Sequence, residues 1–231
     1  STFDTYPARL IQIDRAMREE GPGQAHVLGV HLEGPYLNPK RKGAHPLEYI
    51  RPIDVAEIRR WAGHGAVRIV TLAVELDGAL EAVRGLRALG KIVSIGHSNA
   101  TYEEAMAGFA AGANWATHLY NAQSPLLHRE PGLMGAILVS PVPCGLIADG
   151  IHSHPAMVNL AWKAKGMNGI TLVTDCMAAM GMAPGQYMLG HYDVIVTPDS
   201  ARLSDGTLAG SILRMDQAVR NVMSFTSCSL A

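Results

Sequence analysis

The chain has 231 residues, with 19 Lys and Arg against 20 Asp and Glu, so its formal net charge is -1. Its longest basic run is PKRK at 39–42. This near-neutral charge offers no basic surface for nucleic acid, and small-molecule chemistry is the favoured class. No apolar stretch approaches the ~20 residues of a membrane span, and nothing at the N-terminus reads as a signal peptide. We therefore expect no nucleic-acid partner and no membrane association.

Hydrophobic residues make up 48% of the chain, enough to bury a sizeable core as one globular domain. Its three cysteines, Cys144, Cys176 and Cys228, are odd in number and have no CxxC spacing. This pattern indicates neither a disulfide framework nor a cysteine zinc site. A reducing compartment, the cytoplasm, is the expected location.

Strand-like and helix-like patterns alternate along the chain. Short apolar runs predict strands at 27–33, 67–73, 92–97, 114–118, 144–149 and 170–175. Amphipathic patterns predict helices at 54–63, 77–89, 101–111 and 154–166. After them, 186–210 reads as a loop or hairpin, and a last helix is predicted near 212–225. Thr101 and Glu104 have the spacing of a capping box, and Pro155 suits a first helical position. The alternation predicts parallel strands with right-handed crossovers.

Polar side chains stand at the C-terminal ends of several predicted strands, where parallel sheets and barrels place their chemistry. These residues are Glu33, His97, His118 and Asp175. A lone histidine in such a place is more often a hydrogen-bonded core residue than a ligand. Together, however, one Glu and two His are a plausible ligand set for Zn²⁺ or another borderline divalent ion, with positions left open for water and substrate.

Six collinear segments resemble the N-acetylglucosamine-6-phosphate deacetylases, a family of the amidohydrolase superfamily. They are HLEGPYLNPKRKGAH, GHSNATYEEA, THLYNAQSPLLHREPG, ADGIHSHP, LVTDCMAAMG and GTLAGSILRMDQAVRN. The resemblance runs from about residue 28 to about residue 222, and six blocks in one order are far more specific than a single short motif. It departs from the family pattern at three positions: Cys176 stands where Ala is usual, Gln123 where Met is usual, and Val74 where Pro is usual.

The resemblance implies an α/β fold, a TIM-like (β/α)8 barrel of the amidohydrolase type. It aligns residue 27 with the third barrel strand and Asp175 with the eighth, so about six of the eight strands are expected here. The family's small β domain is expected to be missing. We therefore interpret residues 1–231 as a partial barrel catalytic domain without its flanking N- and C-terminal segments, either a fragment or a sequence with segments left out.

The resemblance also implies a role for each polar residue. Glu33, His97 and His118 would hold a divalent metal, zinc first, with iron, manganese or cobalt as the other options. Asp175 would take a proton from the attacking water and give it to the sugar nitrogen. His45 would hydrogen-bond the acetyl carbonyl and stabilise the developing oxyanion, although without the resemblance it reads as a solvated loop histidine.

A second group is implied for the phosphate of the substrate. Asn121, Ala122 and His152 would donate hydrogen bonds to it, and Arg129 would reach it across the interface of a homodimer. An arginine in a polar loop is otherwise usually just solvated. The implied reaction removes the acetyl group from N-acetylglucosamine 6-phosphate and yields glucosamine 6-phosphate and acetate.

Two alternatives stay open. Another amidohydrolase reaction, such as cyclic-amide hydrolysis or aminopurine deamination, would share the metal ligands but would have no use for a phosphate clamp. A non-catalytic barrel fragment would at most bind metal or sugar phosphate.

Overall fold

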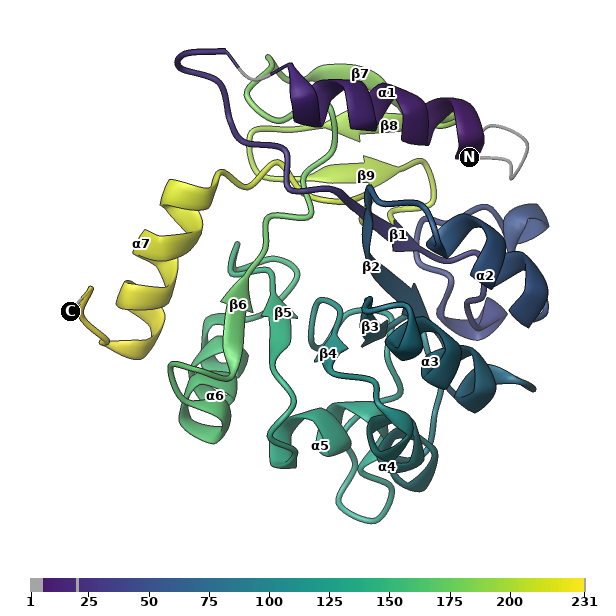
Figure 1. Cartoon of the computed structure of the whole chain (residues 1–231). Helices are drawn as coiled ribbons and strands as arrows, with labels where there is room; N and C mark the ends of the chain where they lie inside the picture. The colour runs from purple at the N-terminus through teal and green to yellow at the C-terminus, as the bar shows by residue number, and fades with distance from the viewer. Residues whose placement is uncertain (1–5, 20, 231) are drawn as a thin grey trace.

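The computed structural model describes residues 6–19 and 21–230. Its centre is a parallel sheet of six strands in chain order, β1 to β6. The strands are β1 (Val30–Glu33), β2 (Val67–Leu72), β3 (Ile92–Ile95), β4 (Trp115–Ala116), β5 (Cys144–Leu146) and β6 (Ile170–Leu172). Figure 1 shows them side by side in an arc, with helices outside it. All six predicted strands are confirmed, and the arc is part of a TIM-like barrel.

The predicted crossover helices are confirmed as well. They are α2 (Val55–Ala62), α3 (Ala79–Ala88), α4 (Tyr102–Ala111) and α6 (Pro155–Lys165), followed by α7 (Met215–Thr226). The capping box of α4 is present, because the Thr101 side chain accepts from the Glu104 N–H and the Glu104 carboxylate accepts from the Thr101 N–H. Pro155 occupies the start of α6. Helices α4 and α6 therefore begin where their predicted capping residues place them.

The core lies between the strands and the inner faces of these helices. Val70, Leu72 and Ile95 from the sheet and Val83 and Leu86 from α3 are fully buried. Burial of each such side chain contributes about 1.5–3 kcal/mol to folding before entropy is counted. This packing fixes the sheet, and with it the strand ends that carry the polar residues.

Two helices were not predicted. Helix α1 (Tyr6–Arg18) buries only Leu10 completely, so its sequence has little apolar pattern. Helix α5 (Gly132–Val139) is buried on nearly every side, so apolar residues occur all around it and no helical period is visible. Within the described residues, no helix combines the length and the apolar character needed to cross a membrane.

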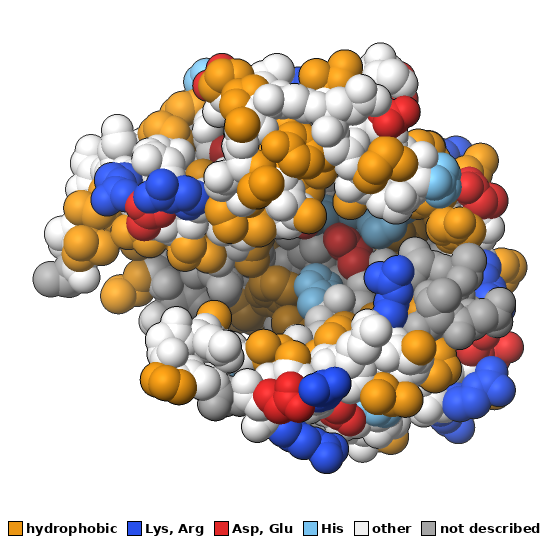
Figure 2. All heavy atoms as spheres, turned by 90° about the horizontal axis from the view of Figure 1, so that it is seen from above, with side chains coloured by type: hydrophobic (Ala, Val, Ile, Leu, Met, Phe, Trp, Pro, Cys, Tyr) orange, Lys and Arg blue, Asp and Glu red, His pale blue; other side chains and the backbone are white. Residues whose placement is uncertain are grey.

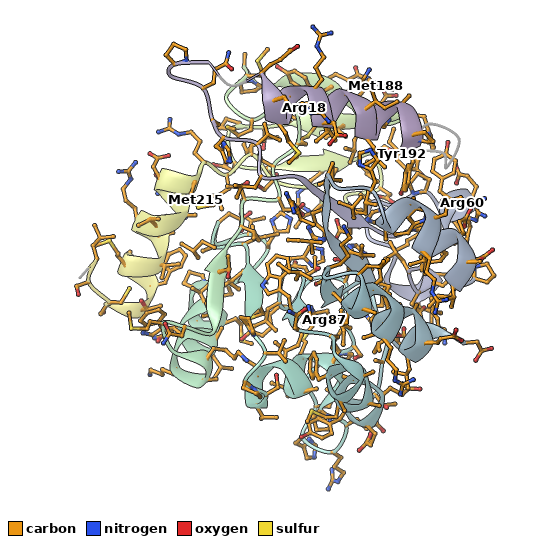
Figure 3. The ribbon with its side chains drawn as sticks, viewed as in Figure 1. Arg18, Arg60, Arg87, Met188, Tyr192 and Met215 are labelled. Carbon is orange, nitrogen blue, oxygen red and sulfur yellow. The ribbon has the colours of Figure 1, made fainter. Side chains whose placement is uncertain are left out.

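The region read as a loop or hairpin forms a small antiparallel sheet of β7 (Gly185–Leu189), β8 (Tyr192–Val196) and β9 (Ala201–Leu203). It has its own small core around Val194, Val196 and Ala209. The small sheet and α1 lie at the same end of the molecule, where Met188, Tyr192 and Arg18 are labelled in Figure 3. The family's separate small β domain is not found in the described part of the chain, as expected.

Candidate metal centre and active-site cleft

A cleft of about 810 Å³ opens at the C-terminal ends of the parallel strands. Its walls also include residues of α1 and of the turn between β7 and β8. Figure 2 shows the hollow from above, with acidic and histidine side chains at its base and hydrophobic side chains around it. Eight of the nine predicted site residues line this cleft: Glu33, His45, His97, His118, Asn121, Ala122, His152 and Asp175.

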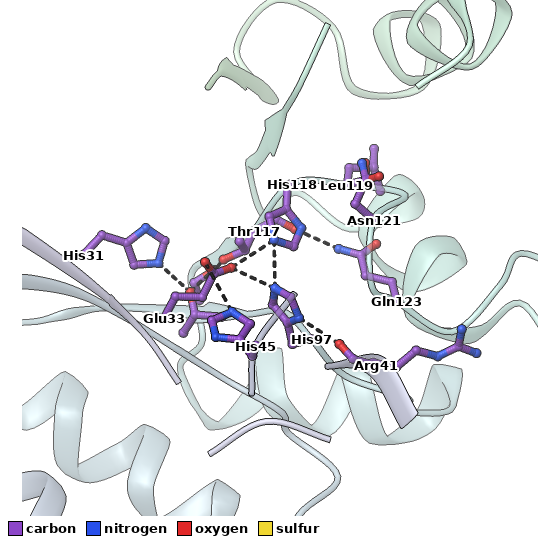
Figure 4. A network of polar contacts seen from close by, with 12 residues as sticks. His31, Glu33, Arg41, His45, His97, Thr117, His118, Leu119, Asn121 and Gln123 are labelled. Atoms are coloured by element: carbon purple, nitrogen blue, oxygen red, sulfur yellow. Dashed lines mark hydrogen bonds and ion pairs between the residues drawn. The ribbon is translucent and has the colours of Figure 1, made fainter. Parts of the chain in front are cut away.

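Three of these residues form a compact cluster. Oε1 of Glu33 lies 2.9 Å from Nε2 of His118 and 3.1 Å from Nε2 of His97. The two Nε2 atoms are 3.1 Å apart. Figure 4 shows the three side chains converging from separate elements. Both imidazoles are 5% exposed, so the cluster is shielded from solvent except through the cleft.

The backbone aims these side chains by leaving the strands abruptly. Glu33 ends β1, whereas His97 and His118 each follow the last residue of their strand by two positions. His97 and His118 have positive φ angles of 48° and 26°, and Asp175 after β6 has a φ of 48°. Such conformations cost about 1–3 kcal/mol each and cluster at functional sites. Gly96 permits the turn at His97, because a Cβ there would lie 2.8 Å from Cβ of Thr117.

The donor atoms fit a divalent ion. Nδ1 of His97 donates to the carbonyl of Arg41 at 2.7 Å, so in the neutral ring Nε2 has a free lone pair. Ligand atoms at ordinary zinc distances in a tetrahedral shell are about 3.3 Å apart, close to the spacing within the cluster. One carboxylate oxygen and two imidazole nitrogens are also a typical zinc donor set. Glu33, His97 and His118 therefore form a candidate metal site.

The charges of the cluster agree with this interpretation. Burial opposes ionisation of Glu33, but its hydrogen bonds to His118 and His97 outweigh burial and hold the pKa of the carboxyl well below its usual range. Burial alone would lower the pKa of His118. The hydrogen bond to Glu33 and the negative charge of the Glu33 carboxylate outweigh burial and raise the pKa of His118. Glu33 is thus an anion at neutral pH, the form that binds a cation.

His45 stands beside the cluster. Its Nε2 lies 3.9 Å from Oε2 of Glu33, and its ring packs edge to face on His97 with centroids 4.6 Å apart. Burial, with a further contribution from His97, lowers the pKa of His45 to about 4. The imidazole is therefore neutral at physiological pH and keeps one N–H with which to donate a hydrogen bond.

Asp175 faces the same cleft from the end of β6. Solvent reaches Asp175 through the cleft. Partial burial nevertheless raises the pKa of its carboxyl. The charge of Glu33 raises this pKa further, whereas His118 lowers it without cancelling the rise. The Asp175 carbonyl accepts from the Ser211 N–H at 2.7 Å. Gly210 leaves room for this contact, because a Cβ there would lie 2.8 Å from the Asp175 carbonyl oxygen. The segment GTLAGS thus fixes the position of the acid.

The predicted phosphate residues are only partly brought together. Asn121, Ala122 and His152 line the cleft. Nδ1 of His152 lies 2.6 Å from Oδ2 of Asp149, which orients the imidazole. Arg129 is exposed and hydrogen-bonded to His128, and it does not line the cleft of its own chain. A role for Arg129 within its own subunit is therefore not supported by its position.

Further cleft residues were not predicted, among them Arg9 of α1, Tyr49 and His191. Nε2 of His191 lies 3.4 Å from Oε1 of Glu48, and its ring contacts Tyr49 at a centroid distance of 6.0 Å. His191 occupies the turn between β7 and β8, and Arg9 belongs to a helix without a clear pattern. Only their folded positions bring them to the cleft.

Comparison with known proteins identifies the family. Residues 2–224 match the model of the amidohydrolase family. The chain belongs to this family. It is 46% identical over 226 residues to the N-acetylglucosamine-6-phosphate deacetylase of Lysinibacillus sphaericus. This match covers 94% of this chain and 58% of the relative. It is also 42% identical over 232 residues to the N-acetylgalactosamine-6-phosphate deacetylase of Escherichia coli O157:H7. That match covers 99% of this chain and 61% of the relative.

A solved structure has the same fold. A mutant of the deacetylase from Mycobacterium smegmatis, in complex with N-acetyl-D-glucosamine-6-phosphate, superposes with a TM-score of 0.88 at 37% identity. The match covers 97% of this chain and 59% of that one. The chain therefore spans less than two thirds of the length of the proteins it matches.

Proposed function

We propose that this chain carries the catalytic centre of a metal-dependent amide hydrolase that acts on N-acetylglucosamine 6-phosphate. Water would cleave the bond between the acetyl carbon and the sugar nitrogen, and the products would be acetate and glucosamine 6-phosphate. The observation that carries the proposal is the cluster of Glu33, His97 and His118 in one cleft with Asp175. The similarity to deacetylases of acetylated amino-sugar phosphates supports it.

Glu33, His97 and His118 would hold the metal, for which zinc is our first choice. A divalent ion in such a site supplies a Lewis acid that polarises the amide carbonyl and acidifies water. Asp175 would accept the proton of the attacking water and return it to the sugar nitrogen, because an amine leaves only when protonated. His45, neutral at physiological pH, would donate its N–H to the acetyl oxygen as negative charge develops there.

The phosphate would bind at the other side of the cleft. Ala122 has a φ of 50°, a turn conformation that suits a backbone N–H aimed at an anion. Asn121 and His152 would add side-chain donors. Arg129 would act on the cleft of a partner subunit in a homodimer, which agrees with its exposure on its own chain. We place the enzyme in the cytoplasm, where phosphorylated sugars occur.

The configuration of the sugar at C4 is a second question, because one relative acts on the galactosamine compound. We favour the glucosamine substrate as the first candidate, since its relative is the more similar of the two.

The test is a direct assay of acetate release by the zinc-loaded protein. N-acetylglucosamine 6-phosphate, its galactosamine epimer and unphosphorylated N-acetylglucosamine would be compared. We expect the first to give the highest kcat/KM and the unphosphorylated sugar the lowest. Release of ammonia from an aminopurine without release of acetate from any of the three sugars would contradict the proposal.

A further inference from the structure

Asp149 and His152 form a nearly buried pair in the loop between β5 and α6. Nδ1 of His152 lies 2.6 Å from Oδ2 of Asp149, and the two side chains are 7% and 10% exposed. Oδ1 of Asp149 accepts from the N–H groups of Ile151 and His152 at 2.8 and 2.7 Å. Burial opposes ionisation of Asp149, but these hydrogen bonds outweigh it and lower the pKa of the carboxyl. Asp149 is therefore an anion at neutral pH.

This pairing decides which nitrogen of a neutral His152 carries the proton. A carboxylate only accepts hydrogen bonds, so Nδ1 is the donor and the single proton of the neutral ring lies there. Nε2 then carries a lone pair. Among the described residues, none forms a hydrogen bond with Nε2, and the ring lines the cleft. The neutral ring thus offers an acceptor, not a donor, to a ligand in the cleft.

A phosphate group does not bind to such a nitrogen. At pH 8 a phosphate monoester is mostly a dianion, because its second pKa is about 6, and its oxygens then only accept hydrogen bonds. Two acceptors repel each other, so contact between the phosphate and Nε2 of His152 requires a proton between them. With that proton the imidazolium would lie between two anions, Asp149 and the phosphate, and opposite charges nearby stabilise the charged ring.

Other charged side chains near His152 come from the neighbouring elements. Asp175, at the end of β6, interacts electrostatically with His152 and shares the cleft with it and with the metal cluster. Asp199, after β8, and Arg214, before α7, line a second cavity of about 430 Å³ that His152 also lines. The guanidinium of Arg214 is already paired with a carboxylate of α7. Of these groups, Asp149 is the one that bonds the ring.

We propose that His152 takes up a proton when the phosphorylated sugar binds, and that Asp149 makes this uptake necessary by holding the proton of the neutral ring on Nδ1. The inference rests on the proposed function, because it takes the phosphate to lie at His152. The proton comes from solvent and stays between Nε2 and a phosphate oxygen. Because binding consumes a proton, affinity for the phosphorylated sugar falls as pH rises, by about tenfold per pH unit where the free ring is neutral.

The test counts the protons that the zinc-loaded protein takes up when N-acetylglucosamine 6-phosphate binds at pH 8. Asp175→Asn serves as the parent protein, so that the sugar binds without hydrolysis and Asp175 contributes no proton of its own. Titration calorimetry is run in buffers of different ionisation enthalpy, because the slope of the binding enthalpy against that of the buffer gives the number of protons. We expect an uptake near one proton, and an affinity that weakens about tenfold from pH 8 to pH 9.

Asp149→Asn, added to the parent, should abolish the uptake. The oxygen of the introduced amide keeps the contacts with the two backbone N–H groups, and its NH₂ group donates to Nδ1 of His152. The proton of the neutral ring then lies on Nε2, which donates to the phosphate without a further proton. We expect an uptake near zero and an affinity nearly independent of pH. Asp199→Asn, which removes an exposed carboxylate of the second cavity, is the matched control and should keep the parent's uptake.

A second readout needs no change at residue 149. Nitrogen NMR of the parent with ¹⁵N-labelled histidine should show His152 protonated on Nδ1 alone in the free protein and on both nitrogens in the complex. This readout and the parent's uptake decide the inference should the Asp149→Asn protein fail to fold. A parent uptake closer to zero than to one, or an uptake that stays closer to one after Asp149→Asn, would overturn the inference and leave the proposed function intact. Absence of binding of the phosphorylated sugar by the parent would contradict the proposed function and this inference together.

Discussion

The Nε2 atoms of His97 and His118 lie 3.1 Å apart although the two residues follow different strands. Nε2 of a neutral His97 carries a lone pair, because its Nδ1 donates to the Arg41 carbonyl. A lone pair held this close to a second imidazole and to the Glu33 carboxylate is suited to a shared cation. The arrangement leads to the first prediction.

Replacement of Glu33, His97 or His118 by Ala should remove most of the bound metal and most of the activity together. The reason is that the three side chains would bind one ion, so each loss leaves only two ligands. Metal analysis and acetate release on the same preparation measure both effects. His26→Ala, an exposed histidine outside the cleft, is the control and should change neither. A full equivalent of tightly bound metal in each ligand variant would show that the assignment is wrong.

Asp175→Asn should lower turnover by at least the ~10² to 10⁴ typical of a lost general acid or base. The amide keeps the size of the carboxylate but neither accepts nor returns the proton. Metal content and substrate affinity should change little. Single-turnover rate and metal stoichiometry, measured on the same variant, separate this role from that of a ligand. A near-normal rate, or a variant without metal, would remove Asp175 from catalysis.

Arg129→Ala should lower kcat/KM for the phosphorylated substrate and leave the slow turnover of the unphosphorylated sugar nearly unchanged. A charge-assisted contact to phosphate is worth roughly 1.5 to 3 kcal/mol, which is about 10- to 150-fold in kcat/KM. Equal losses on both substrates would contradict the phosphate role.

A mixed dimer tests whether Arg129 acts across an interface. One protomer would carry Arg129→Ala and the other Asp175→Asn. The Arg129→Ala protomer keeps its own Asp175 and would take Arg129 from its partner, so one working site should be restored. If activity stays at the level of the parent variants, Arg129 does not act on the partner's site.

Lys165→Met should lower the free energy of unfolding by about 2 kcal/mol, as for a lost hydrogen bond to a charged group. Nζ of Lys165 donates to the carbonyls of Ile137, Ser140 and Val142 at 2.6 to 2.7 Å, and so binds the C-terminal end of α5 to α6. Denaturant unfolding measures the loss. Lys163→Met, an exposed lysine on the same helix, should have little effect. Equal stability of the two variants would show that these contacts contribute nothing.

Asp149→Asn should lose stability at neutral pH but little in strong acid. Burial would raise the pKa of Asp149, but hydrogen bonds from His152 and from the Ile151 N–H outweigh it and lower the pKa. A folded-state pKa below the unfolded value of about 3.9 stabilises the protein above that pH, and the effect fades as pH falls through the folded value. The difference in melting temperature between wild type and variant should therefore shrink from pH 6 to pH 3. Asp193→Asn, at an exposed position, is the control.

The sequence by itself determined the alternation of strands and helices, because apolar periodicity and capping residues are local signals. The strands ending at Glu33 and before His97 and His118, and the capping box at Thr101, lie where the pattern predicts. The same local signals failed for α5, which is buried on nearly all sides and has no polar face to mark a period.

Only the tertiary structure decided which of these residues meet. Glu33 and His118 are 85 positions apart, and their 2.9 Å contact exists because parallel strands bring their C-terminal ends to one edge. Spacing along the chain carries no information about that distance. The same holds for His191, which reaches the cleft through the small sheet.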